Sequence, residues 1–148
     1  YTQEDTKYVP GTNGGKMSKS ANNIINIFLE DKALRKQVMS IETDSTPLED
    51  PKDTATCKIF AIYKLLATET QVAAITEKYK NANKDFGWGH AKQALFELII
   101  GKFKVEREKY AYYMNNKHEV DRLLLQGAEK AREKANEVLQ RVRQKLGY

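Results

Sequence analysis

The C-terminal stretch of the chain carries the longest regular pattern in the sequence. Small or apolar residues recur there at steps of four or three, at Val120, Leu124, Ala128, Ala131, Ala135, Val138, Val142 and Leu146. This spacing follows the 3.6-residue turn of an α-helix, because a strand would alternate every two residues. Asn116 with Glu119 marks a start, and Gly147 stands where a glycine often ends a helix. The sequence therefore predicts one long helix whose small-residue stripe lets another helix approach.

Shorter helical patterns fill much of the chain upstream. We expect helices over about residues 31–41, 54–67, 68–80 and 90–114. Thr68 and Gln71 have the spacing of a capping box. Residues 24–29 are short, apolar and β-branched, which favours a strand. The fold expected is mainly α: an antiparallel helical bundle preceded by this short strand and a glycine-rich loop.

Composition and charge narrow the classes of function. The 148 residues can bury one moderate core, and no apolar run approaches the length of a membrane span, so no membrane partner is expected. The single Cys57 fits a reducing cytoplasm, and no Cys/His cluster has metal-ligand spacing. Residues 102–148 hold twelve basic and seven acidic residues, which accounts for the whole net charge of +5. Such a region indicates either a polyanion partner or a solvated helix surface.

Residues 16–20 read Lys-Met-Ser-Lys-Ser and follow Gly11, Gly14 and Gly15. Glycine lets a backbone turn sharply and approach a ligand closely, and lysine is a compact cation that suits phosphate. The combination indicates a mobile clamp on a polyphosphate. The alternative is a solvated Lys/Ser turn.

This pentapeptide and its surroundings carry a family resemblance. Residues 9–23 resemble the signature loop of class I aminoacyl-tRNA synthetases. Residues 31–38, Thr-Asp-Ser at 43–45 and Gly-Trp-Gly-His-Ala-Lys at 87–92 resemble the C-terminal half of bacterial tryptophanyl-tRNA synthetases. The resemblance runs from about Val9 to Gly147. It implies that residues 1–29 end a catalytic domain and that residues 30–148 form a helical anticodon-binding domain.

The resemblance also implies roles for single residues. Lys19 would contact the phosphates of ATP and Lys16 would assist, so these two are the candidate catalytic residues. Met17, Ser18 and Ser20 complete the candidate ATP site. ATP would enter as a substrate with Mg²⁺, and no metal is expected to be bound by the protein itself. Candidate tRNA contacts are Arg132, Arg141 and Arg143 on the last helix.

The sequence lacks the second class I signature, a His-Ile-Gly-His type motif, and its histidines are His90 and His118. We therefore expect the chain to be the C-terminal part of a larger enzyme, whose missing half holds the tryptophan pocket. The full enzyme, expected to be a homodimer, would join tryptophan to tRNA(Trp) with ATP. The isolated chain is expected to be inactive.

Two other functions stay open at this point. The chain could be a non-catalytic helical tRNA-binding module with a decayed loop, although the intact pentapeptide argues against decay. It could also belong to a tyrosine-specific synthetase, although Thr43-Asp44-Ser45 and Gly87-x-Gly89 argue for tryptophan. Tyr110, Tyr112 and Tyr113 are candidates for stacking on RNA bases or for packing, and packing is the favoured role of Trp88.

Overall fold

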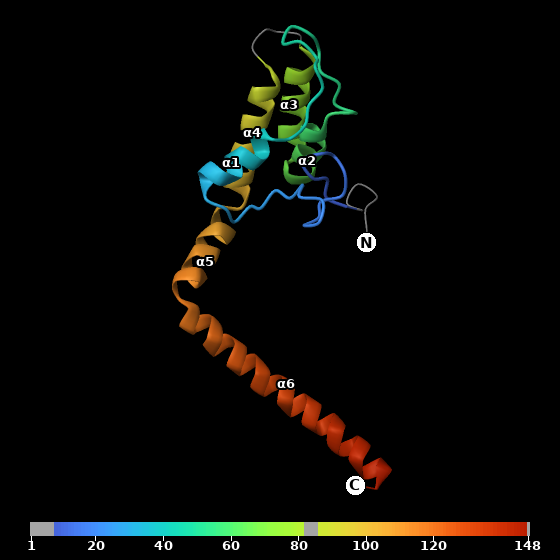
Figure 1. The fold of residues 1–148 in the computed structure, drawn as a ribbon, viewed down its shortest axis with the longest axis vertical. Helices are drawn as coiled ribbons and strands as arrows, with labels where there is room; N and C mark the ends of the chain where they lie inside the picture. The colour runs from blue at the N-terminus through green and yellow to red at the C-terminus, as the bar shows by residue number, and fades with distance from the viewer. Residues whose placement is uncertain (1–7, 82–85, 148) are drawn as a thin grey trace. The chain divides into compact units, whose positions relative to one another are not determined.

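A computed structural model describes residues 8–81 and 86–147 (Figure 1). The chain divides into two compact units, one ending at Arg107 and the other starting at Glu108, and each is described by itself. The helices among the described residues are α1 (Asp31–Met39), α2 (Lys58–Leu66), α3 (Glu69–Lys80), α4 (Trp88–Lys102), α5 (Lys104–Asn115) and α6 (Lys117–Leu146). The predicted mainly α fold is confirmed. No helix among these residues is long and apolar enough to cross a membrane.

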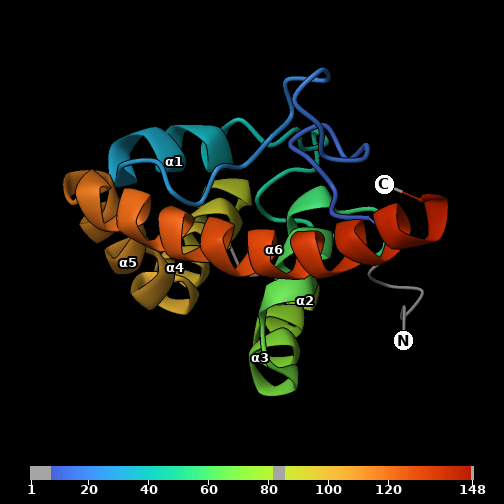
Figure 2. The ribbon, with the colours of Figure 1, turned by 90° about the horizontal axis from the view of Figure 1, so that it is seen from below.

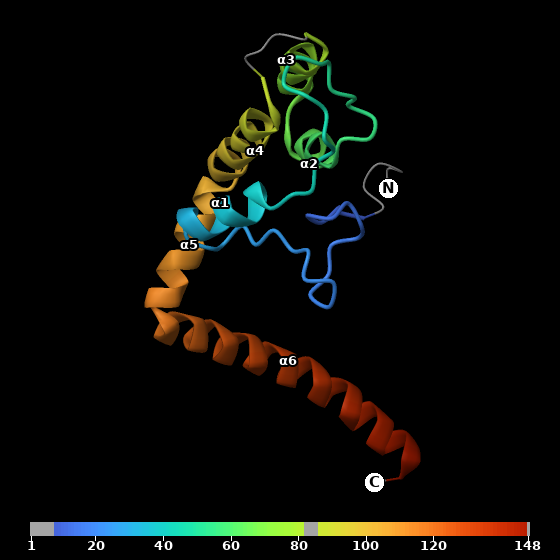
Figure 3. The same cartoon turned by 45° about the horizontal axis from the view of Figure 1, so that its top comes forward.

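The core of the first unit forms where α4 packs against α1 and α2 (Figure 3). Leu34 and Val38 lie four residues apart on one face of α1 and are fully buried, as is Ile41 just beyond the helix. Leu95 and Ile99 of α4 lie in the same cluster. The core of this unit therefore forms from apolar residues that recur at helical spacing.

Helix starts in this unit are set by short-range hydrogen bonds. Thr68 and Gln71 form the predicted capping box of α3. The prediction for α2 was wrong at its start, because the helix begins at Lys58 and not near residue 54. Asp53 instead accepts hydrogen bonds from the Ala55 amide at 2.9 Å and the Thr56 hydroxyl at 3.0 Å. This local turn competes with helix formation.

The predicted strand over residues 24–29 is not present, which is the main correction to the expected fold. Within the described residues, no neighbouring strand pairs with this segment. It is held by side chains: the Asn26 amide donates to the Gln37 carboxamide at 2.9 Å, and Arg107 donates to the Ile27 carbonyl. β-branched residues favour a strand only where a partner strand is available, so composition alone misled the prediction.

The long helix expected from about 90 to 114 is broken. It ends at Lys102, and α5 begins at Lys104. Phe103 between them has φ −102° and ψ 19°, outside the α-helical region, and packs against the core. The segment between the helices expected over 68–80 and 90–114 lies partly outside the described residues, at positions 82–85. Its end differs from expectation, since α4 already begins at Trp88.

In the second unit, α6 is one unbroken helix, as predicted (Figure 2). Gly147 ends it with φ +81°, a left-handed conformation that glycine adopts readily. The predicted helix start at Asn116 is confirmed, because Asn116 is the residue that immediately precedes α6. Its side chain does not cap the helix and instead donates to the Tyr112 carbonyl at 2.8 Å. No residue of α6 is buried, and Leu124 is 66% exposed. The packing expected for its stripe is therefore not found within this unit.

Candidate functional site

A tight hairpin positions the Lys-Met-Ser-Lys-Ser segment. Pro10 and Lys16 form an antiparallel bridge, and the Met17 amide donates to the Val9 carbonyl at 2.8 Å. Gly14 takes φ +83° in the connecting turn, which a residue with a side chain rarely adopts. Of the three glycines named from the sequence, Gly11, Gly14 and Gly15, the turn therefore requires Gly14.

The second half of the segment is a turn with Lys19 near its tip. The Ser18 hydroxyl accepts from the Ala21 amide at 3.1 Å and lies 3.2 Å from the Ser20 hydroxyl. The Asn22 amide donates to the Lys19 carbonyl at 3.1 Å, and Asn22 itself has φ +49°. These bonds order the backbone, whereas the side chain of Lys19 is exposed.

Asn23 connects the hairpin and this turn, and only 2% of its surface is exposed. Its side-chain oxygen accepts from the Ser18 amide at 2.8 Å. Its side-chain nitrogen donates to the Lys16 carbonyl at 3.1 Å and to the Asn13 side-chain oxygen at 2.8 Å. Its backbone carbonyl accepts from Thr12 at 2.9 Å. Asn23 was not predicted from the sequence as a functional residue, because its partners are recognised only when the loop is folded.

The two candidate catalytic lysines differ from the methionine between them. Lys16 and Lys19 are exposed, and neither has an ion-pair partner among the described residues. Met17 is half-buried and packs against the apolar core of the first unit. The structure therefore brings Lys16, Met17, Ser18, Lys19 and Ser20 together as an anchored loop that offers two cations to solvent. Such a loop can bind an anion with several phosphate groups.

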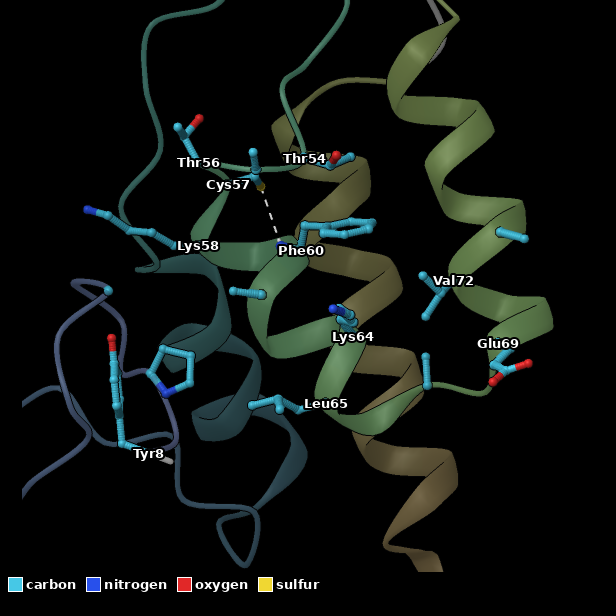
Figure 4. Close-up of a pocket in the computed structure, with 16 residues that line it drawn as sticks. Tyr8, Thr54, Thr56, Cys57, Lys58, Phe60, Lys64, Leu65, Glu69 and Val72 are labelled. Atoms are coloured by element: carbon cyan, nitrogen blue, oxygen red, sulfur yellow. Dashed lines mark hydrogen bonds between the residues drawn. The ribbon is translucent and has the colours of Figure 1, made fainter. Parts of the chain in front are cut away.

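The hairpin is tied to the helices behind it. The Thr12 carbonyl accepts from the Glu42 amide at 2.9 Å, and Glu42 pairs with Lys58 of α2 at 2.7 Å. An open cleft of about 1060 Å³ lies beside the hairpin along α2 and the start of α3 (Figure 4). Lys58 and Lys64 supply its basic groups. The lysines of the predicted ATP loop do not line this cleft.

The three arginines predicted to contact tRNA are all exposed on α6. Because a helix turns about 100° per residue, Arg132 and Arg143 lie within about 20° of each other around the axis. Arg141 lies about 180° from Arg132 on the same helix. The structure therefore brings two of these arginines to one side of α6 and leaves the third on the other side.

The remaining candidates have local roles. The His90 ring nitrogen accepts from the Gly87 amide at 3.1 Å, as expected for a residue closing a helix start. Trp88 packs edge-on against Tyr79, with ring centres 6.1 Å apart, which agrees with the packing role favoured for it. Hydrogen bonding to Glu119 raises the pKa of Tyr112 above its ordinary value.

Asp44, in the Thr-Asp-Ser segment at residues 43–45, stabilises a local turn. Its carboxylate accepts from the Thr46 amide at 2.9 Å. Hydrogen bonds from the Thr46 side chain and backbone lower the pKa of Asp44 below its ordinary value. Within the described part of the chain, no group of three or more His, Cys, Asp or Glu could hold a metal ion.

Comparison with known proteins agrees with this geometry. The family model described as tRNA synthetases class I (W and Y) matches residues 3–104. The chain belongs to this family. The matched residues include the anchored Lys-Met-Ser-Lys-Ser loop and α1 to α4.

The relatives found are tryptophan–tRNA ligases. The tryptophan–tRNA ligase of Campylobacter jejuni is 43% identical over 144 residues, which cover 97% of this chain and 44% of the relative. That of Fusobacterium nucleatum is 41% identical over 146 residues, covering 97% and 43%. The crystal structure of tryptophanyl-tRNA synthetase from C. jejuni complexed with ADP and tryptophan has a TM-score of 0.91 at 42% identity, and covers 100% of this chain and 46% of its own. The chain spans less than half the length of these relatives and corresponds to their C-terminal part.

Proposed function

We propose that this chain supplies the ATP-binding loop and the helical tRNA-binding part of a tryptophan–tRNA ligase. The complete enzyme would activate tryptophan with ATP and transfer it to tRNA(Trp). The observation that carries the proposal is the intact loop over residues 16–20, anchored with both lysines exposed, in a chain 43% identical to tryptophan–tRNA ligases. A loop that had lost its ATP-binding role would not need an intact motif with both lysines exposed.

The chemistry follows from where the negative charge develops. The tryptophan carboxylate attacks the α-phosphate of ATP, the bond from that phosphorus to the bridging oxygen breaks, and pyrophosphate leaves with the electron pair. Lys19, assisted by Lys16, would neutralise the charge that builds on the pyrophosphate. A cation that contacts the leaving group most strongly in the transition state lowers the barrier by differential binding. Because the substrate supplies the nucleophile, this step uses no protein nucleophile.

The other loop residues would bind ATP without carrying charge. Met17 would lie near the adenine, and the hydroxyls of Ser18 and Ser20 would shape the turn and donate hydrogen bonds. Mg²⁺ would arrive with ATP as part of the substrate, held by its phosphates.

The proposal also assigns a separate function to each part of the chain. Residues 1–29 would close the catalytic domain, and residues 30–148 would form the anticodon-binding domain. Arg132, Arg141 and Arg143 would bind the tRNA backbone, because exposed basic residues along one helix attract phosphate. The full-length enzyme would act in the cytoplasm as a homodimer.

Amino-acid-dependent exchange of pyrophosphate into ATP by the full-length enzyme tests this function. Exchange that depends on tryptophan is the expected result. Exchange that depends on tyrosine would identify the tyrosine-specific alternative. An enzyme that binds tRNA(Trp) but exchanges with neither amino acid would identify a non-catalytic tRNA-binding module.

A further inference from the structure

We infer that Asn23 is a positioning residue for the ATP loop, an inference that rests on the proposed function. Asn23 lies outside the Lys-Met-Ser-Lys-Ser segment, yet its side chain bonds to the backbone of Lys16 and of Ser18. It therefore fixes the chain on both sides of Met17, and the second of these bonds lies one residue before Lys19. No part of its side chain needs to touch ATP for this role.

The chemistry of the site calls for asparagine. The side chain must accept one hydrogen bond, from the Ser18 amide, and donate two, to the Lys16 carbonyl and the Asn13 side-chain oxygen. A carboxamide has one oxygen and two N–H groups, so it meets all three demands at once. A carboxylate of the same shape would accept from Ser18 and would face two oxygen atoms without a donor. The Asn13 oxygen is already shared, since it also accepts from the Gly15 amide at 3.0 Å.

The packing around Asn23 supports the same role. A Cβ atom added at Gly11 would lie 2.4 Å from the Asn23 side chain and 2.5 Å from its carbonyl oxygen. That distance is far below a van der Waals contact, so a side chain at position 11 would push Asn23 away. Gly11 is buried and leaves the space that Asn23 fills. The position of Asn23 therefore depends on the absence of a side chain at Gly11.

The consequence for catalysis is geometric. Lysine is a long, flexible side chain, so the position of its ammonium depends on where its backbone starts. A shift of about 1 Å in the position of a reacting group can cost about 10²-fold in rate. Loss of the Asn23 bonds should therefore reduce adenylate formation while leaving tryptophan binding intact, because Asn23 contacts the loop that carries the candidate phosphate-binding lysines.

The test compares full-length enzymes carrying Asn23→Ala, Asn23→Asp or Gly11→Ala with wild type. Steady-state pyrophosphate exchange gives kcat and the KM for tryptophan, tRNA affinity is measured separately, and melting temperature reports folding. We expect kcat to fall about 10- to 10²-fold in all three variants, with an unchanged KM for tryptophan and unchanged tRNA affinity. Gly11→Ala acts without changing any hydrogen-bonding group, so a matching loss would show that the placement of Asn23 matters.

Asn115→Ala is the matched control. Asn115 is an exposed asparagine at the end of α5, outside the ATP loop, so kcat should stay at the wild-type value. Asn23→Asp keeps the volume and the Ser18 bond, and remains a valid test if Asn23→Ala fails to fold. Wild-type kcat in folded Asn23→Asp would overturn the inference, as would equal losses of kcat, tryptophan binding and tRNA binding. Lack of tryptophan-dependent exchange in the wild-type enzyme would instead contradict the proposed function.

Discussion

Lys19 stands near the tip of a turn whose backbone is fixed at Ser18 and at Asn22. The backbone is anchored, whereas the ammonium group is exposed and has no ion-pair partner among the described residues. A cation held in this way is available to a polyphosphate at little cost in ordering the chain. This arrangement makes Lys19 the residue on which the proposed chemistry depends most.

Replacing Lys19 with alanine in the full-length enzyme should lower kcat for adenylate formation by at least about 10²-fold, because a group placed to stabilise transition-state charge is lost. Binding of tRNA should change little. Pyrophosphate exchange and tRNA affinity measure the two effects. Lys32→Ala, which removes an exposed lysine from α1, is the control. A Lys19→Ala enzyme that exchanges at the wild-type rate would show that the loop has another role.

Two aspartates that accept local hydrogen bonds, Asp44 and Asp53, should make stability depend on acid pH. Hydrogen bonds, chiefly from Thr46 to Asp44 and from the Ala55 amide to Asp53, lower the pKa of each carboxyl below its ordinary 3.8. A lowered pKa in the fold gives stability that is present above about pH 4 and is lost as pH falls through the lower folded value. The melting temperature should therefore drop below pH 3.8.

The Asp44→Asn and Asp53→Asn double variant checks this prediction. Asparagine still accepts a hydrogen bond from the backbone amide, so the turns are kept while the titrating groups are removed. As the pH is lowered from about 6 to about 3, the melting temperature of the variant should fall less than that of wild type. Equal slopes would assign the acid sensitivity to other groups.

At the scale of elements, local chemistry predicted helices well. The Thr68–Gln71 box and the face carrying Leu34 and Val38 depend on residues three or four apart, which the sequence displays directly. The strand prediction over 24–29 was wrong, because a strand depends on a distant partner that this segment lacks among the described residues. Asn23 was missed for a related reason, since its bonds reach residues ten and eleven positions away. What the sequence could not display was contact between residues far apart along the chain.

The basic surface of α6 has two sides that can be tested separately. The apolar stripe runs between Arg132 and Arg143 on one flank and Arg141 on the other, because of the helical rotation. Lys130, Lys134 and Lys145 share the flank of Arg141. A single line of phosphates cannot contact both flanks of the helix at once.

Replacing Arg132, Arg141 and Arg143 together with alanine should weaken tRNA binding by the full-length enzyme. Removal of one arginine–phosphate interaction should flatten the log–log salt dependence of tRNA affinity by about one unit at most. Comparing Arg132→Ala/Arg143→Ala with Arg141→Ala assigns the effect to one flank. Adenylate formation should be unchanged, which pyrophosphate exchange verifies.

Glu129→Gln with Glu133→Gln, on the face of α6 opposite the stripe, controls for net charge alone. These changes should not weaken binding. If the arginine triple variant keeps wild-type affinity and salt slope, the basic residues of α6 are a solvated surface with no tRNA contact.

At the scale of the molecule, the first unit holds a buried core, and the chain covers less than half of its relatives. The cluster around Leu34, Ile59, Leu95 and Ile99 is fully buried by α1, α2 and α4 within the first unit. Burial of this kind supports cooperative folding. The ATP loop is bound to the same unit through the Thr12–Glu42 hydrogen bond. Folding of this unit and formation of the loop are therefore expected to go together.

The isolated 148-residue chain should unfold cooperatively on heating and should not exchange pyrophosphate into ATP with tryptophan. It has the loop that would bind the phosphates, whereas we propose that the tryptophan pocket would lie in the part of the full-length enzyme that this chain does not cover. Circular dichroism on heating measures the first property, and radiolabelled pyrophosphate exchange measures the second, with the full-length enzyme as positive control. Exchange above a no-protein control would place the amino-acid site within residues 1–148. Gradual loss of helix signal without a transition would show that the buried cluster needs the rest of the enzyme to fold.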